Sequence, residues 1–241
     1  MEEGKMYKGL KKDQYYLSQF RYDVDSGVYF PPEQEGYAIN YSDGIRVENY
    51  ILKAIKGSKD VTDNSDELMR SVRDWPSYYH LAKGRSNILR ALDLPADSEI
   101  LELGSGCGAL TRYLGENFEL VDGIEGSPLR AQIARERCRD LENVRLFCSD
   151  FQRAKFDFQY DVVTLIGVLE YAPRHSLNHN GQNESCLSIL ELAKGALKEN
   201  GTLIVAIENK IGIKYWSGCP EDHTGKVFEG IHGYPSKQGT V

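Results

Sequence analysis

Cysteines are few in this sequence, and their spacing is not that of a metal site or a redox pair. The 241 residues include five cysteines, which are widely spaced and contain no C-x-x-C pair. An odd number of cysteines without such a pair argues against a disulfide framework and against a zinc knuckle. The composition therefore predicts a reducing compartment, which we take to be the cytoplasm.

Long apolar runs and clusters of basic residues are also missing. No run approaches the ~18 apolar residues of a membrane span, and residues 1–10 have no apolar segment typical of a signal peptide. The 36 acidic residues outnumber the 29 basic ones, which gives a formal net charge of -7. This balance disfavours strong binding to nucleic acids or anionic membranes, so a small-molecule or neutral-glycan acceptor fits better.

Apolar runs and helical patterns alternate through the middle of the chain. Strands are expected near 99–103, 119–124, 143–148, 160–166 and 201–207, and helices near 109–116, 127–139 and 184–199. Such alternation predicts an α/β fold with a parallel sheet and helices on both faces. Ligands of these folds bind beyond the carboxyl ends of the strands.

A glycine-rich turn, Gly-Ser-Gly-Cys-Gly at 104–108, follows the first expected strand of this series. Glycines allow the backbone to approach a ligand closely, because they carry no Cβ. The turn also fits the dinucleotide pattern G-x-G-x-x-G/A, so NAD and S-adenosylmethionine are both candidate cofactors at this point. Glu125 closes the second apolar run, where a carboxylate can accept both ribose hydroxyls of either cofactor.

Two further acidic residues narrow the choice of cofactor. Asp150 and Phe151 follow the third strand and offer a carboxylate for an exocyclic amine beside an aromatic face for a purine. Glu102 lies next to the glycine turn, where its charge would repel a pyrophosphate but suits the ammonium of a methionine moiety. The charges therefore favour S-adenosylmethionine.

These ordered motifs resemble class I S-adenosylmethionine-dependent methyltransferases. The resemblance rests on residues 102–108, 123–127, 148–151 and 160–171 and covers roughly residues 80–210. It implies a Rossmann-like fold and S-adenosylmethionine as the cofactor. We assign to cofactor binding Glu102, Gly104, Ser105, Gly106, Gly108, Glu125, Gly126, Ser127, Ser149, Asp150, Phe151 and Ile166, with Arg85 from a preceding helix as a candidate for the cofactor carboxylate.

A narrower resemblance concerns residues 74–81 and 220–225, which are similar to a bacterial subgroup often fused to, or encoded near, glycosyltransferases. It implies O-methylation of a saccharide or polysaccharide precursor and a fused or associated glycosyltransferase as partner. The alternatives are methylation of another small molecule or of RNA, and a noncatalytic cofactor-binding domain of a larger glycan-synthesis protein.

A general base is needed only if the acceptor must lose a proton, and the expected candidates lie after the fourth and fifth strands. His223 is preferred, with Asp222 beside it to steady the ring, and Glu170 with Tyr171 is a second possibility. His175 and His179 are further candidates. Glu208 and Asn209 loosely resemble the ligands of magnesium-dependent O-methyltransferases, but no matching carboxylate follows the fourth strand, so we expect no metal.

Residues 1–70 are predicted to form a tyrosine-rich α+β extension, and residues 71–241 the cofactor-binding domain. The turn at 42–44 predicts a hairpin of strands at 37–41 and 45–47, followed by a helix to about residue 56 and a polar linker at 57–65. Helices at 66–73 and 79–92 are expected to cover the pocket. The two strands that normally end this fold are missing, so the chain looks C-terminally truncated and its fifth strand should form a sheet edge.

Overall fold

The computed structural model describes residues 14–32, 42–171, 182–209, 211–221 and 224–233. Its main element is a seven-stranded sheet in the order β2-β3-β6-β5-β4-β8-β9. Every neighbouring pair is parallel except β2 and β3, which form an antiparallel hairpin. The strands are β2 (Arg21–Asp23), β3 (Val28–Phe30), β4 (Glu99–Leu103), β5 (Leu120–Glu125), β6 (Val144–Cys148), β8 (Tyr160–Ile166) and β9 (Leu197–Ala206). The predicted α/β fold is confirmed.

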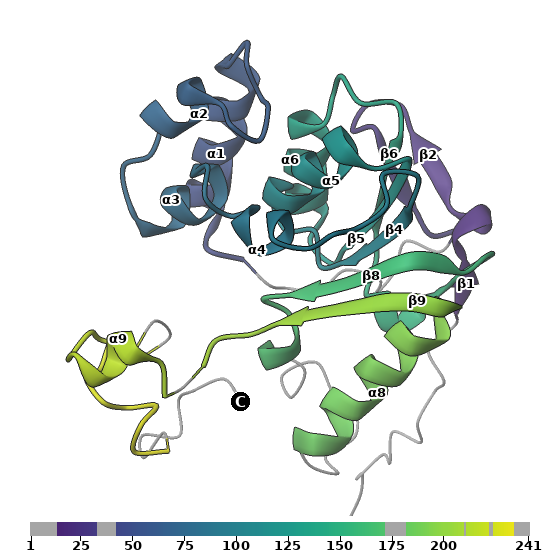
Figure 1. Cartoon of the computed structure of the whole chain (residues 1–241). Coiled ribbons are helices and arrows are strands. Elements are labelled where there is room, and N and C mark those ends of the chain that lie inside the picture. Colours follow the sequence, from purple (N-terminus) through teal and green to yellow (C-terminus); the bar gives the residue numbers. More distant parts are fainter. Residues whose placement is uncertain (1–13, 33–41, 172–181, 210, 222–223, 234–241) are drawn as a thin grey trace, which may run out of the picture.

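Helices cover both faces of the sheet (Figure 1). One face carries α4 (Asn87–Arg90), α5 (Ala109–Asn117) and α6 (Pro128–Arg137), and the other carries α8 (Gln182–Gly195). Side chains of β4 alternate between the two cores: Ile100 packs with α5 and α6, while Leu101 and Leu103 belong to the cluster that contains Ile189 of α8. Apolar residues on both faces are what a buried parallel strand requires.

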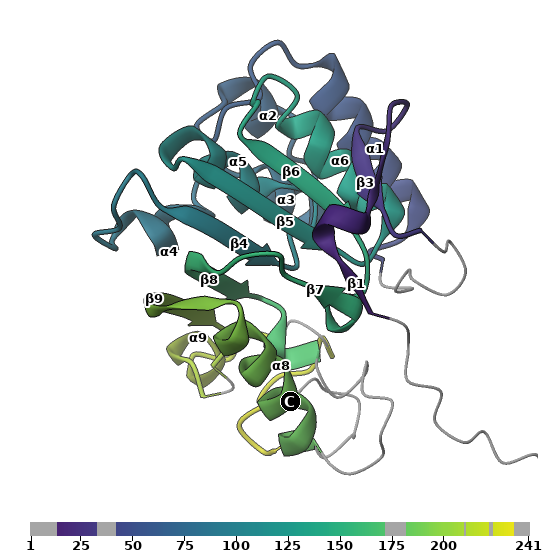
Figure 2. The ribbon, with the colours of Figure 1, turned by 90° about the vertical axis from the view of Figure 1, so that its right-hand side faces the viewer.

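The N-terminal residues extend the sheet beyond β6 (Figure 2). β1 (Tyr15–Tyr16) pairs with the short β7 (Ala154–Lys155), and the β2–β3 hairpin adds to the edge through β3. The hairpin predicted around residues 42–44 is wrong in its second strand, because residues 45–47 begin helix α1 (Ile45–Gly57). Val47, Ile51 and Ile55 recur at helical spacing and pack into one cluster, which outweighs the local turn signal. Residues 37–41 lie outside the described part.

Three helices form a layer over one side of the molecule, and we call them the helical cap (Figure 1). They are α1, α2 (Asp66–Arg70) and α3 (Trp75–Leu81), and their apolar side chains pack against Ile133 of α6. The predicted helix over 79–92 is instead split between α3 and α4, because α3 starts early, with Asp74 as its N-cap and a proline in its first turn. Residues 57–65 are not a loose linker, since Val61 and Asp63 are buried.

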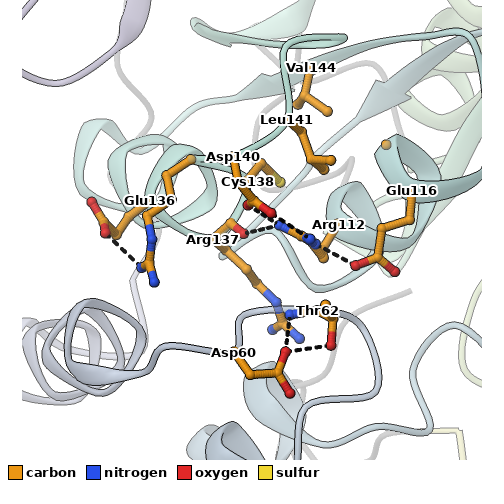
Figure 3. Close-up of polar contacts among 12 residues, drawn as sticks. Asp60, Thr62, Arg112, Glu116, Glu136, Arg137, Cys138, Asp140, Leu141 and Val144 are labelled. Atoms are coloured by element: carbon orange, nitrogen blue, oxygen red, sulfur yellow. Dashed lines mark hydrogen bonds and ion pairs between the residues drawn. The ribbon is translucent and has the colours of Figure 1, made fainter.

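Two buried arginines join neighbouring helices: Arg112 joins α5 to the end of α6 (Figure 3), and Arg137 joins α6 to the cap. Arg112 of α5 donates to Glu116 at 2.6 Å, to Asp140 at 3.0 Å and to the backbone oxygen of Arg137 at 3.2 Å. The fully buried Arg137 side chain donates to the backbone oxygen of His80 in α3. Burial lowers the pKa of Arg137, so this cation is held at a cost in solvation.

The outer strand on the other side of the sheet is β9. Helix α8 ends at Gly195, earlier than the predicted 199, because Leu197 already pairs with Tyr160 of β8. Within the described residues β9 is a sheet edge, as predicted, and the N-terminal hairpin extends the opposite edge instead. The short helix α9 (Ile213–Trp216) follows. The predicted domain boundary near residue 70 stays a proposal.

The length and hydropathy of the described helices bear on membrane insertion, and the state of the cysteines bears on disulfide formation. None of the described helices is both long enough and apolar enough to cross a membrane. All five cysteines are free thiols, and Cys107, Cys138 and Cys148 are buried. Burial raises the pKa of the Cys148 thiol to about 12, so it stays protonated and unreactive at neutral pH.

Candidate functional site

A cavity of about 490 Å³ opens at the carboxyl ends of β4, β5, β6 and β8, under the helical cap. Its size is typical of a small-molecule site. Most of the cofactor residues predicted from the sequence line it: Arg85, Glu102, Gly104, Ser105, Gly106, Glu125, Gly126, Asp150, Phe151 and Ile166. The structure therefore brings these residues to one cavity, from four strand ends and the loop between α3 and α4.

The three glycines of the turn have different structural roles. Gly104 has a φ of 86°, and a Cβ there would lie 2.4 Å from Val168 Cγ2. Gly108 has a φ of 81°, and its Cβ would lie 2.7 Å from the backbone of Ala134, so this glycine lets α5 approach α6. Gly106 has a φ of 54° with nothing within 4 Å of its Cβ position. The space over Gly106 is the cradle that an adenosine-type ligand needs.

Glu125 holds the glycine turn against the start of α6. Its Oε2 accepts the Gly106 amide at 2.8 Å, and its Oε1 accepts the Ser127 amide at 2.8 Å. Burial raises the pKa of this carboxyl, opposed by the Ser127 amide and by the charge of Arg130. A carboxylate oxygen has two lone pairs, so each oxygen retains one for a ribose hydroxyl.

Glu102 lies deeper, at the end of β4. Its side chain is buried, and its Oε2 accepts the Thr111 hydroxyl at 2.6 Å. Burial raises the pKa of Glu102 to about 7, with the charge of Glu125 adding to the effect and Thr111 opposing it. A cation that binds beside this carboxyl would lower its pKa and so favour its ionised form at neutral pH.

The third strand end supplies Asp150 and its neighbours. Asp150 is buried, lines the cavity and accepts the Gln152 amide at 3.0 Å. Phe151 lines the cavity next to it. Ser149, Ser127 and Gly108 do not line the cavity: the Ser149 amide bonds to the Glu125 carbonyl, Ser127 caps α6 and Gly108 precedes α5. These three residues therefore hold the backbone of the strand ends and helix starts next to the cavity.

Arg85 and the β8 end close the opposite side of the cavity. The Arg85 guanidinium lies 3.8 Å from the centre of the Tyr79 ring, a cation–π contact between loop and cap. A Cβ on Gly167 would lie 3.0 Å from the Tyr79 hydroxyl and 3.8 Å from Glu170 Oε1. Glu170 is buried and lines the cavity with Tyr171. Tyr79 of the cap and Glu170 therefore both lie beside Gly167, at the end of β8.

Most of the remaining catalytic candidates lie outside the described residues. Asp222, His223, His175 and His179 lie outside the described residues, and their predicted roles stay predictions. Glu208 lines the cavity at the end of β9. In the part of the chain that the structure describes, no group of three or more His, Cys, Asp or Glu side chains is arranged to hold a metal ion.

The cap contributes cavity residues that the sequence motifs did not predict. Trp75, Tyr79, His80 and Asp43 line the cavity from above, and Arg130 lines it from α6. Three of them stand in residues 74–81, which we used only for a family resemblance. The sequence feature that could have indicated them is the aromatic-rich start of this helix. The sequence does not show, however, that the helix packs over the glycine turn.

The central segment is similar in sequence to known methyltransferases. Residues 100–182 match the family described as Methyltransferase domain. A demethylmenaquinone methyltransferase of Tropheryma whipplei (strain Twist) is 30% identical over 90 residues, which are 37% of this chain and 38% of that protein. A probable ribosomal RNA small subunit methyltransferase A of Methanothermobacter thermautotrophicus is 38% identical over 72 residues, 30% of this chain and 26% of that protein. The matched part spans less than two fifths of either relative.

Among solved structures, an S-adenosylmethionine-dependent methyltransferase from Clostridium acetobutylicum aligns with a TM-score of 0.46 and 20% identity, over 65% of this chain and 59% of that one. The family match runs from β4 through β8 and so includes the glycine turn, Glu102, Glu125 and Asp150. Residues 100–182 are therefore similar to a methyltransferase domain.

Proposed function

We propose that this chain binds S-adenosylmethionine in the cavity and transfers its methyl group to a hydroxyl of a saccharide or polysaccharide precursor. The cofactor part is supported by the open space over Gly106, flanked by carboxylates at three strand ends. In this proposal Glu102 meets the ammonium of the methionine moiety, Glu125 the ribose and Asp150 the adenine. Arg85 meets the methionine carboxylate.

Methyl transfer from a sulfonium requires the protein mainly to position the acceptor and the cofactor. The bound sulfonium supplies a methyl group that is already activated, so the chain must align the acceptor and exclude water. Buried carboxylates close to the sulfonium stabilise the ground state more than the transition state, since positive charge leaves sulfur during transfer. We therefore keep Glu102 and Glu125 as binding residues, and Glu170 with Asp222 and His223 as the candidates for proton transfer.

The charged and aromatic side chains that line the cavity favour a polyhydroxylated acceptor over RNA. Six carboxylates line the cavity, and the two guanidinium groups, Arg85 and Arg130, both contact other side chains of the protein. RNA recognition requires a track of Arg and Lys for the phosphates, whereas sugars pack on aromatic rings and bond to carboxylates. Trp75 lines the cavity and remains 59% exposed, with Tyr78 stacked beside it at 5.9 Å. This exposed ring is the observation that carries the acceptor proposal.

Calorimetry tests the cofactor part. Replacing Glu125 with alanine should weaken binding of S-adenosylhomocysteine by on the order of 1–3 kcal/mol, because bonds to the ribose and to the Gly106 amide are both lost. Glu119→Ala is a matched control, since Glu119 is exposed and precedes the same strand that Glu125 ends. Equal affinities of the Glu125 variant and the wild type would rule out the ribose assignment.

The acceptor is tested by following a labelled methyl group. The protein would be incubated with labelled S-adenosylmethionine and fractionated cell extract that includes lipid-linked glycans. We expect label in a saccharide fraction, and less of it with Trp75→Ala. Label found only in RNA would overturn the saccharide proposal and leave the methyltransferase proposal standing. Tight cofactor binding without transfer to any fraction would favour the noncatalytic alternative.

A further inference from the structure

A polar cluster outside the predicted motifs joins the cap to the cavity. His80 Nε2 lies 3.0 Å from Asp43 Oδ2, and Arg130 Nη2 donates to the same oxygen at 2.7 Å. Arg130 Nε donates to Glu48 Oε1 at 2.8 Å. His80 and Glu48 are buried, and Asp43, His80 and Arg130 all line the cavity. The cluster is formed by Asp43, two positions before α1, and by residues of α1, α3 and α6.

The cluster fixes which nitrogen of His80 carries the proton. Hydrogen bonding to His80 and the charge of Arg130 lower the pKa of Asp43, so its carboxylate is ionised and only accepts hydrogen bonds. His80 Nε2 must therefore donate to Asp43. Burial is the largest effect on His80 and lowers its pKa, which keeps the ring neutral. Nδ1 is then the nitrogen with the free lone pair.

This lone pair has no partner among the described groups. Of the His80 ring nitrogens, only Nε2 bonds to another residue in the part of the chain that the structure describes. The backbone of His80 is also held, because the fully buried Arg137 donates to its carbonyl oxygen. A fixed ring that lines a cavity and offers one acceptor atom is suited to a ligand with an O–H or N–H donor.

The position of the cluster indicates which ligand group that is. Arg130 lies in the first turn of α6, directly after Glu125 and its Ser127 cap, and its charge acts on Glu125. Asp43, which bonds to Arg130, and His80 therefore line the same cavity as Glu125, the carboxylate assigned to the ribose. Each Glu125 oxygen already accepts a backbone amide and keeps one lone pair, so an acceptor in the cap can share the two ribose hydroxyls with Glu125.

We propose that His80 is part of the cofactor site and that its Nδ1 accepts a hydrogen bond from a ribose hydroxyl. Asp43 and Arg130 are positioning residues that hold the ring in this tautomer. The inference rests on the proposed function, because it takes the nucleoside to lie over Gly106. It adds a cap residue to a site that the sequence motifs place only at strand ends.

Binding of ribose-modified ligands tests this role. The affinities of wild type and His80→Gln are measured by calorimetry for S-adenosylhomocysteine and for its 2′-deoxy and 3′-deoxy analogues. Glutamine keeps an N–H toward Asp43 but has no acceptor at the Nδ1 position. We expect the variant to bind the parent ligand about three- to tenfold more weakly, and to bind one deoxy analogue as well as wild type does. Tyr78→Phe, on the exposed side of α3, should change none of these affinities.

Each outcome bears on a separate claim. If His80→Gln weakens all three ligands equally, or none, His80 does not bond to the ribose and the inference fails while the cofactor assignment stands. If wild type binds none of the three ligands, the proposed function fails, and this inference with it. If the variant does not fold, ¹⁵N NMR of the wild type provides the test. The Nδ1 resonance of His80 should shift upfield when S-adenosylhomocysteine binds. An unchanged resonance overturns the proposal.

Discussion

Replacing Arg130 with methionine is expected to lower the free energy of unfolding by about 3–5 kcal/mol. The variant leaves Glu48, whose side chain is 2% exposed, without the guanidinium that bonds to it at 2.8 Å. Breaking a buried pair is costly because the remaining charge keeps its desolvation penalty and loses its attraction. Denaturant unfolding monitored by circular dichroism measures the loss.

Two further variants test this explanation. Arg130→Met combined with Glu48→Met removes both charges and should recover most of the lost stability, because two apolar side chains then fill the space. Lys83→Met removes a cation from a surface pair with Asp66, which is 74% exposed, and should cost less than about 1 kcal/mol. A double variant no more stable than Arg130→Met would show that the loss does not come from the stranded Glu48.

Glu102 is expected to make stability depend on pH between about 4.5 and about 7. Because burial raises its folded pKa above the unfolded value, the folded state binds the proton more tightly. The contribution of Glu102 is therefore fully favourable below pH 4.5 and is lost as the pH rises to about 7. Glu102→Gln cannot ionise, so the stability of the variant relative to wild type should rise by roughly 3 kcal/mol over this range.

The same group should couple cofactor binding to proton release. A cation beside Glu102 lowers its pKa, so binding of S-adenosylhomocysteine near pH 7 should release part of a proton. Calorimetry in two buffers with different ionisation enthalpies measures this number, and Glu102→Gln should abolish the difference. Unfolding curves for wild type and variant that stay parallel from pH 4.5 to 7 would contradict the raised pKa.

The sequence alone was sufficient for the central sheet and the strand-end residues. The apolar runs at 99–103 and 160–166 coincide with β4 and β8, because a strand buried on both faces is mostly apolar. The carboxylates Glu102, Glu125 and Asp150 line one cavity, since parallel strands bring their carboxyl ends to the same edge. These conclusions need only local patterns and the rule that crossovers are right-handed.

Tertiary packing decided the rest of the site. The turn at 42–44 begins a helix instead of joining two strands, because Val47, Ile51 and Ile55 find partners in the cap and on α6. Asp43 and His80 are 37 positions apart in the chain and meet only when that helix is packed. Local sequence thus determined the sheet and the cofactor loop, whereas contacts between distant segments determined which side chains cover the cavity, since no short-range pattern encodes such contacts.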